Sequence, residues 1–202
     1  IGGYVDFAGA IAPDLIQRAV EWLVAKHDAL RTQLHTDANG LPRQTFAKAL
    51  AGQVPQHDFS TRPDPQAAAQ AWMQAQMARP YAMAGEPLFR VFLGKLDDDH
   101  YRLGTPAHHL ILDGWGFGQM LQSLARLYTD LQHGRQAEPQ APSYIDFIDT
   151  DQRYHQSARY ARDRAYWLDK YQQLPEPLLT PRHTAHAPSN AFVEAFPVAL
   201  LN

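Results

Sequence analysis

Apolar residues recur at three- and four-residue steps in two long segments of the chain, a spacing typical of helices that bury one face. The first segment opens with Pro13 and Asp14, which suit the first turn of a helix. The second runs from 114 to 133 and precedes Gly134, a residue type that commonly ends helices. We predict two amphipathic helices, the first with one continuous apolar stripe. That stripe comprises Leu15, Ala19, Val20, Leu23, Val24, His27, Leu30 and Leu34.

Shorter apolar runs and turn residues predict the remaining elements. The pattern predicts strands at 4–8, 44–48, 88–96, 100–107 and 192–200, helices at 66–78 and over most of 144–174, turns at 39–40 and 97–99, a loop at 53–65 and a linker at 138–142. Both element types occur in mixed order, so the predicted fold class is α+β. The chain opens at Ile1 without a signal segment, and its last predicted strand has no partner after it, so we expect a piece of a longer protein.

Composition and charge exclude several classes of protein. The 202 residues, 45% of them apolar, suffice to bury a core in one ordinary domain or two small ones, which excludes global disorder. A net charge of −3 supplies no basic field for phosphate backbones, so we expect no nucleic-acid partner. No apolar run approaches ~18 residues, so we expect no membrane-spanning helix. The lack of cysteine excludes disulfides, thiolate metal sites and a cysteine nucleophile, and fits a cytoplasmic location.

Candidate chemistry is concentrated between the strand at 100–107 and the helix that follows it. His108 and His109 are adjacent, and on an extended segment they point to opposite faces, so one can face a cavity while the other is held in the structure. An imidazole titrates near neutral pH, which suits proton abstraction from an amine or hydroxyl. Asp113 precedes the helix and can accept its N–H groups or pair with an arginine, and Gly114 permits backbone geometry that a Cβ would forbid.

A random His-His pair would most often consist of ordinary surface or core histidines, and that interpretation stays open at this point. Three other chemical interpretations of the segment are less favourable. Adjacent histidines on a strand diverge, so with Asp113 they are poorly placed to bind a metal. No G-x-S-x-G elbow exists for a serine nucleophile. The glycines at 114, 116 and 118 have the wrong spacing for a dinucleotide fingerprint.

Four segments together resemble a known family. Residues 108–114 (HHLILDG) resemble the HHxxxDG motif of condensation domains of nonribosomal peptide synthetases, members of the chloramphenicol acetyltransferase-like superfamily. Residues 26–32 (KHDALRT) resemble the family's RHExLRT segment, 144–147 (YIDF) its YxDFAxW segment, and 166–175 its YW…LP stretch. The resemblance implies a lobe in which a mixed sheet packs with helices. It also implies that 1–202 form the N-terminal lobe of a condensation domain, without the first motif and without most or all of the C-terminal lobe.

The resemblance implies roles for five residues. His109 matches the active-site histidine, which is thought to deprotonate or position an acceptor amine as it attacks a thioester. Asp113 matches an aspartate assigned to structure, and Arg31 matches an arginine suited to pairing with it. Gly114 begins the helix whose N-terminus faces the reaction site, where a developing oxyanion would be favoured. His108 is expected to be structural.

The implied function is peptide-bond formation between a carrier-bound acyl or aminoacyl donor and a carrier-bound aminoacyl acceptor, in antibiotic or siderophore biosynthesis. The expected partners are donor and acceptor peptidyl carrier protein domains, whose 4'-phosphopantetheine arms bring the substrates, an adjacent adenylation domain and the missing C-terminal lobe. The domain itself is expected to bind no cofactor, metal or membrane, and the 202-residue lobe alone is expected to be inactive. Two alternatives remain open: a stand-alone acyltransferase that uses coenzyme A thioesters, and a non-catalytic lobe that only docks carrier domains.

Overall fold

The computed structural model describes residues 1–48, 53–135 and 141–176. The chain divides into two compact units, Ile1–Gln152 and Arg153–Asn202, which are described separately. The elements in chain order are β1 (Tyr4–Ala8), α1 (Pro13–Lys26), the 3₁₀ helix η1 (Asp28–Arg31), β2 (Thr32–Thr36), β3 (Pro42–Phe46), β4 (Gln56–Asp58), α2 (Pro65–Ala78), β5 (Phe92–Lys95), β6 (His100–Gly104), α3 (Gly114–Gln132), α4 (Tyr144–His155) and α5 (Ala158–Lys170).

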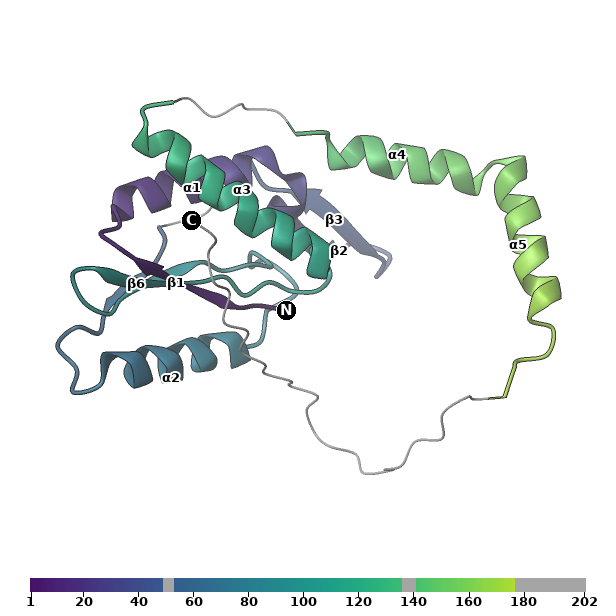
Figure 1. The fold of residues 1–202 in the computed structure, drawn as a ribbon. Helices are drawn as coiled ribbons and strands as arrows, with labels where there is room; N and C mark the ends of the chain where they lie inside the picture. Colours follow the sequence, from purple (N-terminus) through teal and green to yellow (C-terminus); the bar gives the residue numbers. More distant parts are fainter. Residues whose placement is uncertain (49–52, 136–140, 177–202) are drawn as a thin grey trace. The chain divides into compact units, whose positions relative to one another are not determined.

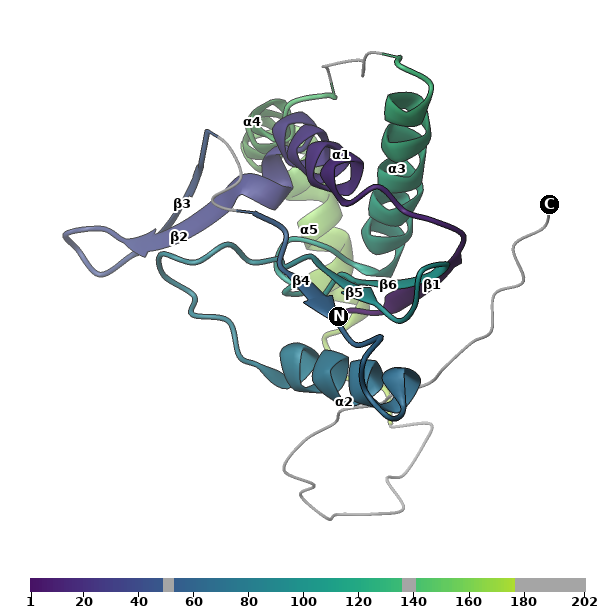
Figure 2. The ribbon, with the colours of Figure 1, turned by 90° about the vertical axis from the view of Figure 1, so that its left-hand side faces the viewer.

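The first unit is built on a four-stranded mixed sheet in the order β1-β6-β5-β4. Strand β6 pairs antiparallel with both neighbours, with Gly104 opposite Tyr4 on one side and opposite Phe92 on the other. Strand β4 pairs parallel with β5, and β2 and β3 form a separate antiparallel hairpin. Helices α1 and α3 cover one face of the sheet and α2 covers the other (Figures 1 and 2). This mixed sheet between helices agrees with the predicted α+β class.

The main core lies between the sheet and the two helices whose periodicity the sequence shows. The apolar stripes of α1 and α3 meet side chains of β5 and β6 there, and the hydrophobic effect favours burial of this surface. The core includes Ile16, Ala19, Val20, Leu23, Val24, Leu93, Leu103, Met120, Leu124, Leu127 and Leu131.

Helix α2 is held on the opposite face by close packing and by a hydrogen bond from Arg102. A Cβ on Gly104 would lie 2.0 Å from the Phe92 ring and 2.7 Å from the Met73 sulfur, so only glycine fits there. The Arg102 guanidinium contacts both β1 and α2. Its Nε donates to an Asp6 carboxylate oxygen at 2.6 Å, and its Nη2 donates to Gln66 Oε1 at 2.9 Å. These contacts fasten β1 and α2 to β6.

Two predictions of secondary structure are wrong in this unit, and others lie outside the described ranges. The first helix ends at Lys26, so the periodic positions Leu30 and Leu34 belong to η1 and β2. Strand β4 lies inside the segment predicted to be a loop, because its partner β5 is distant in sequence and leaves no local signal. The strand predicted at 192–200 and most of the linker at 138–142 fall outside the residues described.

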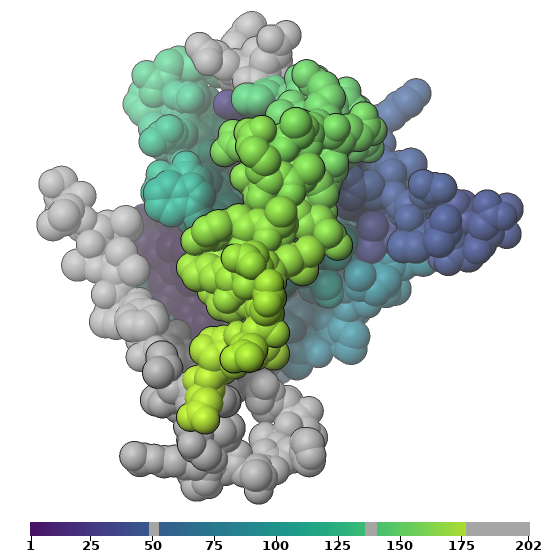
Figure 3. Space-filling view, turned by 90° about the vertical axis from the view of Figure 1, so that its right-hand side faces the viewer, coloured from purple at the N-terminus to yellow at the C-terminus, as the bar shows by residue number. Residues whose placement is uncertain are grey.

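The second unit contains α5, whose first turn is capped by Ser157, with Oγ accepting the Tyr160 N–H at 3.2 Å. Tyr166 and Trp167 are more than half exposed on this helix, which is yellow-green in Figure 3. Across the described parts of the chain, no helix has both the length and the apolar content needed to cross a membrane.

Candidate active site

The two histidines follow the end of β6, where the chain is still held against its neighbour. Ala107 forms a bridge with Phe89, and the His108 N–H donates to the Leu88 carbonyl oxygen at 2.7 Å. These contacts set the backbone of His108 firmly at the edge of the core, because buried backbone groups that are hydrogen-bonded resist displacement.

Immediately after this point the chain turns. The His108 carbonyl oxygen accepts the Ile111 N–H at 3.1 Å, and the His108 Nδ1 accepts the Leu110 N–H at 3.1 Å. His109 therefore lies in a turn and not on the extended segment that the sequence analysis assumed. His109 is exposed and His108 is half-buried, so one imidazole is accessible and the other is held by the structure.

Asp113 is the N-cap of α3. One of its carboxylate oxygens accepts the Gly116 N–H at 2.7 Å, and its carbonyl oxygen accepts the Phe117 N–H at 2.9 Å. The first N–H groups of a helix, here those of Gly114 and Trp115, have no acceptor within the helix. The turn thus places an exposed imidazole five residues before a helix N-terminus, whose partial positive charge favours anions.

The role expected of Gly114 is corrected by the structure. Its φ is not positive, and a Cβ built on it meets no atom of the described residues within 4 Å. The backbone of α3 would therefore accept a side chain at this position. The physical consequence of glycine here is open space beside the first helical turn.

The predicted pair between Arg31 and Asp113 is wrong. Every nitrogen of the Arg31 guanidinium has another partner: Nε donates to the Val24 carbonyl at 3.1 Å, Nη1 to the Ala47 carbonyl at 2.7 Å, and Nη2 forms an ion pair with Asp28. Asp113 uses its carboxylate in the helix cap instead. The sequence alone does not show which carboxylate lies beside Arg31 in the fold.

Asp28 is a structural residue that the sequence analysis did not single out. Its Oδ1 pairs with Arg31, and its Oδ2 accepts the Tyr144 N–H at 2.9 Å and the Ser143 hydroxyl at 3.1 Å. The carboxylate therefore joins the end of α1 to the start of α4. The signal in the sequence was the joint presence of the KHDALRT and YIDF segments, which the structure now connects through this one side chain.

Two further residues that were not predicted from the sequence, Tyr81 and Arg90, lie near His108. The Arg90 guanidinium carbon lies 4.0 Å from the centroid of the Tyr81 ring, and the Tyr81 and His108 rings are perpendicular with centroids 6.0 Å apart. The Tyr81 hydroxyl is buried and has no hydrogen-bond partner in the described structure. Burial raises the pKa of Tyr81 to about 12, although the nearby Arg90 cation acts in the opposite direction.

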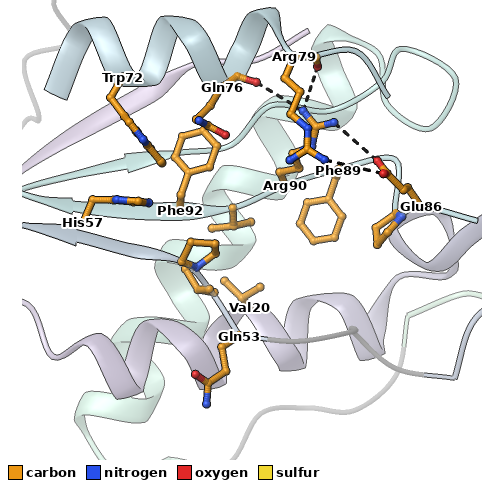
Figure 4. Close-up of a pocket in the computed structure, with 14 residues that line it drawn as sticks. Val20, Gln53, His57, Trp72, Gln76, Arg79, Glu86, Phe89, Arg90 and Phe92 are labelled. Carbon is orange, nitrogen blue, oxygen red and sulfur yellow. Dashed lines mark hydrogen bonds and ion pairs between the residues drawn. The ribbon is translucent and has the colours of Figure 1, made fainter. Parts of the chain in front are cut away.

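Arg90 also borders a cavity of about 460 Å³ between α1, the C-terminal end of α2 and the β5 segment (Figure 4). In the part of the chain that the structure describes, the cavity wall includes neither histidine of the motif nor Asp113. Its lining residues are Val20, Gln53, Val54, Pro55, His57, Trp72, Gln76, Arg79, Glu86, Pro87, Phe89, Arg90, Val91 and Phe92.

Chemically, the histidine turn offers one accessible imidazole, a helix N-terminus and open space beside it. This combination suits proton transfer at a centre where an oxygen gains negative charge. Among the described residues there is no group of three or more His, Cys, Asp or Glu side chains that could hold a metal ion.

Comparisons with known proteins agree with the resemblance of the motifs. The sequence matches the family model for the condensation domain over residues 2–197. It is 34% identical over 193 residues to an isonitrile lipopeptide synthase from Streptomyces coeruleorubidus, covering 94% of this chain and 13% of that protein. It is 32% identical over 181 residues to enterobactin synthase component F from Escherichia coli (strain K12), covering 88% of this chain and 14% of that protein.

A solved structure is similar over most of the chain. The starter condensation domain of rhizomide synthetase RzmA matches with a TM-score of 0.82 and 32% identity, over 88% of this chain and 43% of that one. A variant of that domain has been crystallised in complex with C8-CoA and Leu-SNAC. The chain spans less than half of the solved domain and a much smaller share of the two synthases.

Proposed function

The chain belongs to the condensation-domain family, and from this premise we propose that it supplies the catalytic histidine for peptide-bond formation in nonribosomal peptide synthesis. In the proposed reaction the amine of a carrier-bound aminoacyl acceptor attacks the thioester carbonyl of a carrier-bound donor. The new C–N bond forms, the C–S bond breaks, and the donor carrier is released as a thiol. The same premise supports the chloramphenicol acetyltransferase-like α+β fold.

The observation that carries this proposal is the placement of His109. The imidazole is exposed in a turn whose backbone is fixed by hydrogen bonds that His108 accepts from the Leu110 and Ile111 N–H groups, and α3 begins five residues later. In the proposed mechanism His109 accepts or orients the amine proton as the nitrogen attacks, and that proton finally reaches the leaving thiolate. The free N–H groups at the start of α3 stabilise the negative charge that develops on the carbonyl oxygen.

The proposal includes partners that bring the substrates and complete the site. We propose that residues 1–202 form the N-terminal lobe and that a second, C-terminal lobe supplies the other wall, in line with the 43% of the RzmA domain that the chain covers. Donor and acceptor peptidyl carrier protein domains would present the substrates on phosphopantetheine arms. An adenylation domain would activate the acceptor amino acid.

A second candidate is acyl transfer from a coenzyme A thioester, which is favoured by one observation. A variant of the similar RzmA starter domain was crystallised with C8-CoA, an acyl thioester on coenzyme A, and with Leu-SNAC. In this alternative the same histidine and helix N-terminus serve the same attack, and only the carrier of the donor differs.

One assay separates the candidates. The complete condensation domain is mixed with a leucyl-loaded carrier domain and an octanoyl donor, which is attached either to a second carrier domain or to coenzyme A. Mass spectrometry then measures the amide product. Product from the carrier-bound donor supports the first proposal, and product from octanoyl-CoA alone supports the second. If neither donor gives product above the enzyme-free background, the chain acts as a non-catalytic docking lobe toward these substrates.

A further inference from the structure

Tyr81 lies beside the histidine turn, and its ring contacts two side chains, the Arg90 guanidinium and the His108 imidazole. The Arg90 guanidinium lies over the face of its ring at 4.0 Å, and the His108 imidazole stands perpendicular to the ring at 6.0 Å. Cation–π and edge-to-face contacts both have preferred geometries, so each restricts the orientation of the groups involved. The three side chains form a support stack, Arg90–Tyr81–His108, behind the accessible His109.

Arg90 is a firm base for this stack because its donors are already bound. Its Nη1 donates to the Arg79 carbonyl at 3.0 Å, and a Glu86 carboxylate oxygen lies 3.9 Å from its Nη2 (Figure 4). Its Nη2 also donates to the Pro80 carbonyl at 2.7 Å. The side chain is only 16% exposed. The planar guanidinium thus ties the chain that follows α2 to the segment that leads into β5.

His108 links the orientation of the Tyr81 ring to the conformation of the turn. Its Nδ1 accepts the Leu110 N–H, so in the neutral ring the proton is on Nε2, and its backbone carbonyl accepts the Ile111 N–H. If the His108 ring rotates, the Leu110 N–H loses its acceptor. Leu110 directly follows His109, so the orientation of the His108 ring and the position of His109 are linked through one hydrogen bond.

We propose that Tyr81 and Arg90 are positioning residues for the histidine turn. Arg90 orients the Tyr81 ring, the Tyr81 ring orients the His108 imidazole, and His108 fixes the turn that presents His109. The aromatic ring performs this role, because the buried Tyr81 hydroxyl has no hydrogen-bond partner among the described residues. The catalytic consequence rests on the proposed function, whereas the structural linkage does not.

The first experiment measures condensation kinetics in the complete domain with Tyr81→Phe, Tyr81→Leu and a matched control, Tyr4→Leu. Tyr4 also has an arginine over its ring, Arg102 at 4.2 Å from the centroid. We expect Tyr81→Phe to keep kcat, because the ring remains. Tyr81→Leu should lower kcat by about 10- to 100-fold with little change in KM for the acceptor. A displaced His109 imidazole slows the chemical step, whereas the contacts that bind the acceptor remain. Tyr4→Leu should leave kcat unchanged.

The second experiment is independent of activity and uses nuclear magnetic resonance of histidine-labelled complete domain. His108 ring signals, assigned with His108→Gln, should move in Tyr81→Leu and in Arg90→Lys and stay in place in Tyr4→Leu. If Tyr81→Leu does not fold, Arg90→Lys decides. An unmoved His108 signal in Arg90→Lys, or a folded Tyr81→Leu with wild-type kcat, overturns the proposal. A wild-type domain without any condensation activity would instead contradict the proposed function, and the His108 signals would still test the support stack.

Discussion

Asp28 pairs with Arg31 through one carboxylate oxygen and caps the start of α4 through the other. Both side chains are largely buried, with 17% and 16% exposed. A single carboxylate therefore connects η1, which directly follows α1, to the start of α4, which is more than a hundred residues away in sequence. Arg31 extends the connection to β3 through the Ala47 carbonyl next to that strand.

This relationship predicts strong coupling between Asp28 and Arg31. Asp28→Ala and Arg31→Ala should each lower the free energy of unfolding by about 3 kcal/mol, because each leaves the other partner as an uncompensated, partly buried charge. The double variant should cost clearly less than the sum of the two single changes. Thermal or urea unfolding of the complete domain measures all three. The control cycle pairs Arg31→Ala with Asp113→Ala, and its two effects should be additive. If the control cycle shows coupling and the first cycle is additive, Asp113 and not Asp28 is the partner of Arg31.

The comparison of Arg31 with Asp113 shows what the sequence can predict. The periodic apolar positions, Pro13 at a helix start and Gly134 at a helix end are local signals, and the helices they predict are present at α1 and α3. The partner of Arg31 is not given by such signals. Asp28, three residues before Arg31, and the distant Asp113 were both available, and the sequence does not say which carboxylate lies within reach of the guanidinium; the structure shows the pair with Asp28.

Strand β4 and Tyr81 illustrate the same limit in two other ways. Gln56–Asp58 is short and polar, and it becomes a strand only because β5 offers it a parallel edge. Tyr81 carries no motif, and its importance arises from the contacts with Arg90 and His108 that the fold creates. The motif predicted one accessible histidine and one held by the structure, whereas the turn and its supporting residues required the structure.

His109 and His108 should separate activity from stability. His109→Ala should lower condensation by about 10²–10⁴-fold, the usual contribution of a general base, with little change in melting temperature because the side chain is exposed. His108→Ala should lower the melting temperature, because it removes the acceptor of the Leu110 N–H and the contact with Tyr81. The assay uses loaded carrier domains and the complete condensation domain. A stable His109→Ala with wild-type rate would remove the imidazole from the mechanism.

Asp113 should act through the helix cap. Asp113→Ala removes the acceptor of the Gly116 N–H and should cost about 1 kcal/mol of stability. Asp113→Asn keeps an oxygen acceptor and should recover most of that loss. Urea unfolding of the two variants is compared with their condensation rates. An Asp113→Ala variant that is fully stable but inactive would shift the role of this carboxylate from scaffold to chemistry.

Tyr81 should make the folded state sensitive to alkaline pH. The pKa of Tyr81 is raised from 10.0 to about 12 in the folded chain by burial. Below pH 10 both states keep the proton; as the pH rises from 10 towards 12, the unfolded chain releases it first, so stability falls. Tyr81→Phe removes this loss. We expect the melting temperature of Tyr81→Phe, relative to wild type, to be higher at pH 11 than at pH 9. Equal differences at the two pH values would show that the hydroxyl is not buried in solution.

Gly114 should matter for substrate approach rather than for the backbone. A Cβ at Gly114 meets no atom within 4 Å, and the same holds for Gly118 one turn further along α3. Alanine at Gly118 should stabilise the helix by about 0.5–1 kcal/mol and leave condensation intact. Gly114→Ala should also fold normally. If the thioester carbonyl approaches the N-terminus of α3, however, the new methyl group occupies its path and should slow condensation by at least about tenfold. Rates and melting temperatures of both variants are measured in the complete domain. Equal rates for Gly114→Ala and Gly118→Ala would mean that the carbonyl is bound away from this helix end, and the oxyanion would then need other donors.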